Sequence, residues 1–116
     1  MSRQLTGRAG EDLAASAALA EGYEIVTRNY RCPLGEIDLI LQRGDVVVFA
    51  EVKTRTGTSF GDAWESVTPS KQNRLKKIAL WYTREAGITD RSFRFDVFSI
   101  SNRKDRWDYR WFKDAF

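Results

Sequence analysis

Three charged residues stand in two otherwise apolar stretches of the chain. Asp38 interrupts the apolar run 37–41, and Glu51 and Lys53 follow the apolar run 46–50. Side chains alternate across a β-strand, so Glu51 and Lys53 are expected on one face of the same strand. Because burying a charge without a partner is costly, charged residues at such places are usually paired or serve a function.

Two interpretations of these three residues are open. Carboxylates that converge on one point bind Mg²⁺ or Mn²⁺ through oxygen, and a bound ion polarises a phosphate and lowers the pKa of a water. A lysine beside the ion can orient or deprotonate that water. The alternative is an ion pair of Glu51 and Lys53 at a strand end, with Asp38 capping a turn. Placement on both arms of a hairpin favours the metal site.

The composition excludes several kinds of catalytic site. The chain has no histidine, which excludes serine and cysteine triads, histidine-based nucleases and histidine-rich zinc sites. Cys32 is the one cysteine, so neither an internal disulfide nor a multi-thiolate zinc site can form, and a buried or unreactive thiol is expected. Hydrolytic chemistry must therefore come from carboxylates, lysine, hydroxyls or a metal held by oxygen.

The length of 116 residues predicts one domain that spans residues 1–116. The apolar segment 13–20 is bracketed by Glu11, Asp12 and Glu21, which does not fit a secretory signal. No stretch approaches the roughly 20 apolar residues that a membrane span needs. We therefore expect a cytoplasmic protein that does not associate with membranes.

Basic residues gather locally, although the net charge is only +3. Lys71, Arg74, Lys76 and Lys77 lie within seven residues that contain no acid, and the segment 91–113 holds further arginines and lysines. Such clusters attract a phosphate backbone, although a solvated face is the other interpretation. The residues expected to bind nucleic acid are Arg55, Lys71, Arg74 and Lys77.

The first half of the chain predicts one helix and three strands. Apolar residues recur at helical spacing in 7–21, and Gly22 ends that helix. The β-branched and aromatic segment 23–30 predicts a strand, and a turn at 32–35 follows. Two further strands, 36–42 and 46–54, are joined by Arg43-Gly44-Asp45, which is typical of a hairpin.

The second half predicts a long mobile loop at 55–70, a helix at 70–85 closed by Gly87, and strands at 93–100 and 109–112. The order α-β-β-β-α-β-β indicates an α/β protein of three layers, a sheet with helices on both faces. Period-two alternation in the fourth strand favours the core for Phe93, Phe95 and Val97, with base-stacking platforms as the alternative for the aromatic residues. The fourth strand also holds an acid, Asp96, for which the pattern suggests no role.

Four segments carry a resemblance to a known family: GEDLA at 10–14, RNYR at 28–31, GEIDLI at 35–40 and VFAEVKTR at 48–55. Together with Phe60-Gly61, the 71–79 helix, RFDV at 94–97 and the terminal Ala115-Phe116, they resemble the bacterial YraN-type family. That family is similar to Holliday-junction resolvases within the PD-(D/E)XK nuclease superfamily. The resemblance implies a restriction-endonuclease-like fold around a central mixed sheet.

The resemblance also implies roles for five residues. Asp38 and Glu51 look like metal-binding carboxylates, Lys53 like the catalytic lysine, Glu11 like an additional acid directed toward the metal, and Gln72 like an auxiliary polar residue. Taken alone, Glu11 is more often a helix N-terminal acid favoured by the macrodipole. Glu36 shares a strand face with Asp38, where it can assist the site or face solvent.

These observations predict a protein that depends on Mg²⁺ or Mn²⁺ and acts as an endonuclease on DNA, with branched or structured DNA as one substrate class. A binding or scaffold protein on a nuclease fold is the first alternative. A nuclease directed at RNA is the second, since nothing in the sequence excludes RNA, although DNA is favoured. The aromatic stripe Trp107-Tyr109-Trp111 predicts either core or the surface of a homodimer.

Overall fold

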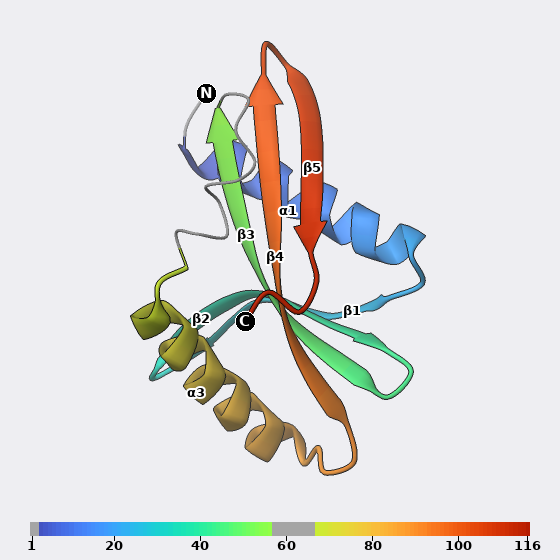
Figure 1. Cartoon of the computed structure of the whole chain (residues 1–116), viewed down its shortest axis with the longest axis vertical. Helices are drawn as coiled ribbons and strands as arrows, with labels where there is room; N and C mark the ends of the chain where they lie inside the picture. The colour runs from blue at the N-terminus through green and yellow to red at the C-terminus, as the bar shows by residue number, and fades with distance from the viewer. Residues whose placement is uncertain (1–2, 57–66) are drawn as a thin grey trace.

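The computed structural model describes residues 3–56 and 67–116, which form a sheet between two helices (Figure 1). The predicted order α-β-β-β-α-β-β is confirmed. Most of the predicted mobile loop at 55–70 lies outside the described residues. The elements are α1 (Arg3–Ala20), β1 (Glu24–Cys32), β2 (Gly35–Arg43), β3 (Val46–Thr56), α3 (Pro69–Ala86), β4 (Ser92–Arg103) and β5 (Arg106–Phe112).

The five strands lie in the sheet in the order in which they occur in the chain, β1-β2-β3-β4-β5. The pair β3–β4 is parallel and the other three pairs are antiparallel. Parallel neighbours need a crossover connection, and α3 lies in that connection. The sheet is therefore mixed, as the resemblance implied.

The ends of α3 follow from local chemistry. The Thr68 hydroxyl accepts the backbone N–H of Lys71, and Pro69 occupies the first turn, where its missing N–H costs nothing. Gly87 ends the helix in the left-handed region at φ 66°, a conformation that glycine adopts without strain. The observed helix is one residue longer at each end than the prediction.

The two helices cover opposite faces of the sheet, and each face has its own core (Figure 1). Neither described helix has the length and hydrophobicity that crossing a bilayer requires. Partly buried Val52 packs with the core under α1, so it points away from Glu51 and Lys53 as predicted. The core under α1 includes Ala14, Ala17, Ala18, Leu39, Leu41, Val48 and Phe98. The core under α3 includes Leu75, Ile78, Ala79, Ile40, Phe49 and Val97.

The aromatic stripe of β5 belongs mainly to the α1 side. The Trp111 ring stacks on Phe98 at 4.6 Å and lies 5.1 Å from the Tyr23 ring. Trp107 packs against the same core, whereas Tyr109 is 39% exposed. The core interpretation is therefore confirmed for the two tryptophans, and the homodimer stays a prediction. Cys32 is half-buried against the core under α3.

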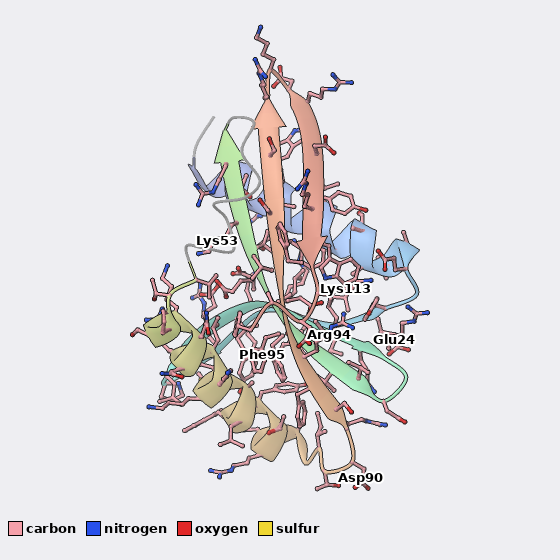
Figure 2. The ribbon with its side chains drawn as sticks, viewed as in Figure 1. Glu24, Lys53, Asp90, Arg94, Phe95 and Lys113 are labelled. Atoms are coloured by element: carbon pink, nitrogen blue, oxygen red, sulfur yellow. The ribbon has the colours of Figure 1, made fainter. Side chains whose placement is uncertain are left out.

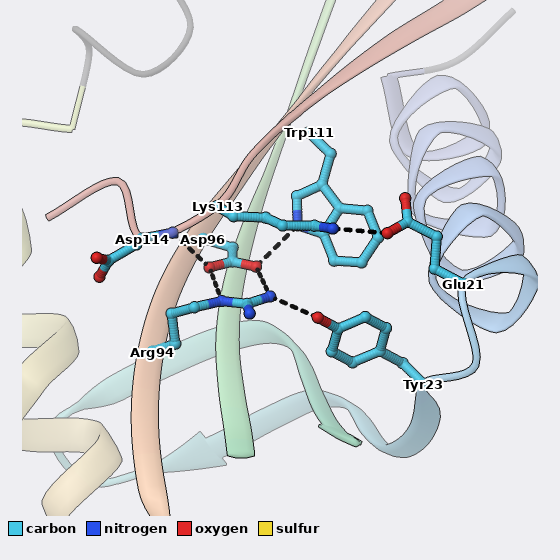
Figure 3. A network of polar contacts seen from close by, with 7 residues as sticks. All are labelled: Glu21, Tyr23, Arg94, Asp96, Trp111, Lys113 and Asp114. Carbon is cyan, nitrogen blue, oxygen red and sulfur yellow. Dashed lines mark hydrogen bonds and ion pairs between the residues drawn. The ribbon is translucent and has the colours of Figure 1, made fainter. Parts of the chain in front are cut away.

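Asp96, the acid without a predicted role, is fully buried at the centre of a hydrogen-bond network (Figure 3). One carboxylate oxygen accepts from Arg94 Nε at 2.9 Å and from the Asp114 backbone N–H at 2.9 Å. The other accepts from Arg94 Nη2 and Trp111 Nε1, each at 2.8 Å. Arg94 Nη2 also donates to the Tyr23 hydroxyl at 2.9 Å. The network joins β4, β5, the C-terminal segment and the residue that precedes β1.

We expect Asp96→Asn to lower the free energy of unfolding by about 3 kcal/mol, because it removes the buried carboxylate charge that the half-buried Arg94 guanidinium pairs with. The amide nitrogen would also face two donors, whichever oxygen it replaces. Urea denaturation measures the loss. Asp90→Asn, at an exposed position between α3 and β4 (Figure 2), is the matched control and should stay within about 0.5 kcal/mol of wild type. Equal stability of both variants would contradict a structural role for Asp96.

Candidate functional site

The site begins where the β2–β3 ladder ends. The paired register runs from Arg43 opposite Val46 to Leu39 opposite Ala50, and Asp38 is the next residue of β2. Its Oδ2 accepts the backbone N–H of Val52 at 2.8 Å. The carboxylate thus satisfies a strand N–H and is held beside β3, so it caps a ladder rather than the turn that the structural alternative predicted.

Glu51 and Lys53 lie on the face of β3 that α3 covers, as the period-two pattern predicted. They line a small cleft of about 80 Å³ beside the N-terminal part of α3, and Figure 2 shows Lys53 near the start of that helix. Lys53 Nζ lies 3.9 Å from Glu51 Oε2. The remaining residues that line the cleft are Glu36, Val67, Lys71, Arg74 and Leu75.

Asp38 is held in a setting that disfavours its charged form. The pKa of Asp38 is raised to about 6, mainly by burial and also by the charges of Glu11 and Glu36. The hydrogen bond from Val52 and the charge of Lys53 offset only part of this effect. Carboxyl groups at catalytic sites commonly show this combination of burial and like charge.

Glu51 behaves in the same way. Burial raises the pKa of Glu51 to about 7, with Asp38 as the next contributor, while Lys53 and Lys71 lower it in part. The two cations therefore do not compensate for the burial of the carboxylate. A Glu51–Lys53 ion pair does exist at 3.9 Å, but it offsets only part of the rise in the pKa of Glu51.

Glu11 comes to the same region from α1, on the other side of the sheet. Its charge raises the pKa of Asp38, and its Oε2 accepts from Asn29 Nδ2 at 3.3 Å. Asn29 is left-handed at φ 56°, a conformation that asparagine tolerates better than most residues. Glu11 is thus tied to β1 and is more than a solvated helix-start acid.

Gly10 lets α1 approach the sheet at this point. A Cβ atom on Gly10 would lie 2.1 Å from Thr54 Oγ1, so with any other residue here either the Thr54 side chain or the helix would have to shift. Because Glu11 is the next residue, the close contact of Gly10 with Thr54 sets how near the Glu11 carboxylate comes to Asp38. The sequence pattern did not predict this contact.

The predicted nucleic-acid-binding residues are divided between the cleft and its surroundings. Lys71 and Arg74 line the cleft, and the charge of Lys71 acts on Glu51. Lys77 lies outside the cleft, one turn further along α3. Arg55 lies two residues beyond Lys53 on β3, opposite Ser101 of β4. The Gln72 side chain donates to the Val67 carbonyl at 3.0 Å, so it holds the chain that leads into α3.

The donor set suits a hard divalent cation. Asp38 and Glu51 offer carboxylate oxygens, and the charge of Asp38 acts on Glu51, so the two groups lie close together. Within the described residues, no group of three or more carboxylate or thiol side chains is arranged to hold a metal by itself. Mg²⁺ is commonly bound through one or two carboxylates and keeps waters or substrate phosphates as its other ligands. The two-carboxylate set therefore fits Mg²⁺ or Mn²⁺.

Residues 10–100 match the model of the family described as "Uncharacterised protein family UPF0102". The chain belongs to the UPF0102 family. It is 45% identical over 100 residues to a UPF0102 protein of Moorella thermoacetica, which covers 86% of this chain and 83% of the relative. It is 44% identical over 110 residues to one of Hahella chejuensis, with 95% and 88% covered.

A UPF0102 protein of Symbiobacterium thermophilum is 45% identical over 117 residues and aligns along 100% of this chain and 98% of its own. The matched segment 10–100 of this family member begins at Gly10 and contains Glu11, Asp38, Glu51 and Lys53. The resemblance drawn from short motifs is therefore confirmed at the level of this family.

We expect Gly10→Ala to destabilise the protein by about 1–3 kcal/mol through overpacking against Thr54. The sign of the change in stability is informative, because replacing glycine by alanine in an unobstructed helix would stabilise the protein by about 1 kcal/mol. Combining it with Thr54→Ala, which removes Oγ1, should recover part of the loss. Urea denaturation of both single variants and the double variant measures this coupling. Additive effects would show that the two residues do not press on each other.

We expect the metal-free protein to lose stability as the pH rises from about 4 to 7. The pKa values of Asp38 and Glu51 in the folded protein, about 6 and 7, exceed their ordinary values of 3.8 and 4.5. The folded state therefore binds more protons in this window, and the free energy of unfolding falls as they are released. The loss should be several kcal/mol, because a pKa difference of one between the folded and unfolded states corresponds to about 1.4 kcal/mol.

Chelated protein unfolded thermally at pH 5 and pH 8 tests this expectation. Glu51→Gln removes one of the two titrating groups and should reduce the difference between the two pH values. Glu24→Gln, at an exposed position on β1, should leave the difference as it is in wild type. A Glu51→Gln protein with the wild-type pH dependence would contradict the raised pKa.

Proposed function

We propose that this protein is a divalent-metal-dependent endonuclease of the PD-(D/E)XK superfamily that acts on DNA. The observation that carries the proposal is the placement of Asp38 and Glu51 at the open end of one hairpin, with Lys53 beside them. Two carboxylates with raised pKa values and one lysine are the groups that hydrolysis of a phosphodiester needs when no histidine is present.

Asp38 and Glu51 would hold Mg²⁺ or Mn²⁺, with Glu11 as an additional acid directed toward them. When bound, such an ion supplies a Lewis acid that stabilises charge on the phosphate and lowers the pKa of a water. The protein keeps the two carboxylates in place through the Val52 hydrogen bond and the surrounding cores.

Lys53 is the candidate for handling the attacking water. Its ammonium lies beside Glu51, where it can orient the water and offset the negative charge that develops on the phosphate. The water oxygen forms a new bond to phosphorus while the bond from phosphorus to one bridging oxygen breaks. The proton released by the water balances the proton that the leaving alkoxide takes up to become a hydroxyl group. Lys71 and Arg74, which line the same cleft, would hold the adjoining phosphates.

DNA is the favoured substrate, and branched or structured DNA is the class that the likeness to Holliday-junction resolvases suggests. The same site chemistry serves RNA, so RNA belongs in the same assay. A nucleic-acid-binding or scaffold protein without cleavage is the competing function, and it predicts binding that does not depend on Mn²⁺.

We expect Asp38→Asn to lower Mn²⁺-dependent cleavage by at least about 100-fold, since even residues that only support metal ligands act on that scale. Thermal unfolding should show that Mn²⁺ at about 100 times its Kd stabilises wild type by about 2.7 kcal/mol and the variant far less. Without metal, the variant should be as stable as wild type or more stable, because a crowded charge has been removed.

Four-way-junction, supercoiled and linear DNA and a single-stranded RNA are the substrates of that assay. Asp45→Asn, in the exposed turn at the other end of the same hairpin, is the matched control and should cleave as wild type does. The proposal fails if Mn²⁺ neither stabilises wild type nor supports cleavage, and if the only effect of Asp38→Asn is a lower stability than that of wild type.

A further inference from the structure

A groove runs along the outer side of α3 and is continuous with the candidate site. The cleft of Glu51 and Lys53 shares Arg74 with a second hollow of about 430 Å³. Lys77 and Leu34 line that hollow and also a third one of about 490 Å³, which reaches Trp81. Because neighbouring hollows share the residues between them, they form one track, which we call the α3 track.

Basic side chains follow one face of the helix along this track. Lys71, Arg74, Lys77 and Arg84 line its successive hollows, and Trp81 stands between the last two. The spacings of three, three, four and three residues in this series place all five side chains on the same side of an α-helix. The basic residues therefore form a stripe along α3, and its Lys71 end lies in the cleft that contains Glu51.

The far end of the α3 track exposes apolar surface. Leu80 is 51% exposed, Leu34 42% and Trp81 39%, although side chains of this size are usually covered. The one acid in this part of the track, Glu85, accepts a hydrogen bond from the Tyr30 hydroxyl. An aromatic ring thus stands in a groove whose charged lining is mainly positive.

We infer that the α3 track binds a single-stranded nucleic-acid segment and leads it to Asp38 and Glu51. This inference rests on the proposed nuclease function and narrows its substrate to DNA that carries an unpaired strand. Phosphates would lie along Lys71, Arg74 and Lys77, and an unpaired base would stack on Trp81. Channels for single strands combine these two elements, a positive groove and an aromatic platform.

The dimensions of the track match a short strand. From Lys71 to Arg84 the helix rises about 20 Å at 1.5 Å per residue. At the phosphate spacing of about 3.4 Å along one strand of a duplex, this length holds at most about six nucleotides. A duplex keeps its bases inside and offers Trp81 no free base face, so the exposed ring favours a single strand over a duplex.

Fluorescence anisotropy with labelled oligothymidylate of about twelve nucleotides, a length within known single-strand sites, tests the inference beside a blunt duplex. Wild type should bind the single strand more tightly at equal salt. Trp81→Ala should weaken that binding by about 5- to 100-fold, and Trp81→Phe, which keeps a stacking ring, by much less. Equal loss in both tryptophan variants, or a wild type that prefers duplex, would overturn the inference.

Lys77→Ala and Lys76→Ala form a matched pair of charge variants. Lys77 lies in the track, whereas Lys76 Nζ lies 6.0 Å from the Phe116 ring centroid, away from it. Removing one phosphate contact should lower the slope of log affinity against log salt by about 0.7 in Lys77→Ala. Lys76→Ala should keep the wild-type slope. An unchanged slope in Lys77→Ala would overturn the inference.

The two proposals fail separately. If wild type cleaves DNA while Trp81→Ala and Lys77→Ala hold the strand as tightly as wild type, the α3 track is overturned and the nuclease stands. If no DNA is cleaved but both variants lose the strand, the nuclease fails and the track stands. Light scattering measures the oligomeric state of both proteins. If wild type is a dimer and Trp81→Ala is a monomer, the groove binds a second copy of the chain, and the inference is overturned.

Discussion

At the open end of the β2–β3 hairpin, two carboxylates are held largely out of water beside each other. The backbone pairing of β2 with β3 ends at Leu39, so the Val52 N–H has no backbone partner in β2. The Asp38 carboxylate accepts a hydrogen bond from this N–H, which holds Asp38 at the site. Glu51 remains there because the alternation of β3 turns it toward α3 while Val52 turns toward α1. A sheet built for stability alone would place apolar residues at both positions, because neighbouring groups offset only part of the cost of burying these charges.

The surroundings of two aspartates, the buried Asp96 and the half-buried Asp38, differ in how far they balance the carboxylate charge. Asp96 receives four hydrogen bonds, two of them from the Arg94 guanidinium, so its charge is fully matched. The described part of the structure gives Asp38 a single hydrogen bond and surrounds it with Glu11 and Glu36. A carboxylate with few hydrogen-bond donors and like-charged neighbours is better suited to receive a cation than one whose charge is already balanced.

The rest of the molecule keeps these charges close together. The core under α1 and the core under α3 hold the two faces of the sheet, and the Asp96 network fastens the C-terminal segment to β4. Gly10 allows α1 to contact Thr54 directly, which brings Glu11 within electrostatic range of Asp38. On the other face, α3 supplies Lys71 to the cleft and continues outward as the basic stripe.

Local patterns in the sequence were sufficient for the elements and for part of the site. Period-two alternation placed Glu51 and Lys53 on one face, and turn and cap residues such as Gly44 and Gly87 predicted where elements meet. These features depend on neighbours along the chain, so the sequence alone determined them. The predicted strand at 109–112 was three residues too short at its start, because Arg106 and its neighbours are strand only through pairing with β4.

Contacts between distant residues were decided by tertiary structure alone. The hydrogen bond from Arg94 to Tyr23 spans 71 positions, and the roles of Asp96, Asn29 and Gly10 come from elements that meet only in the folded chain. Charge and periodicity suggested that Asp38 could bind a metal. They could not show which carboxylate has its charge balanced by hydrogen-bond donors and which does not, because that depends on the donors around each one in three dimensions.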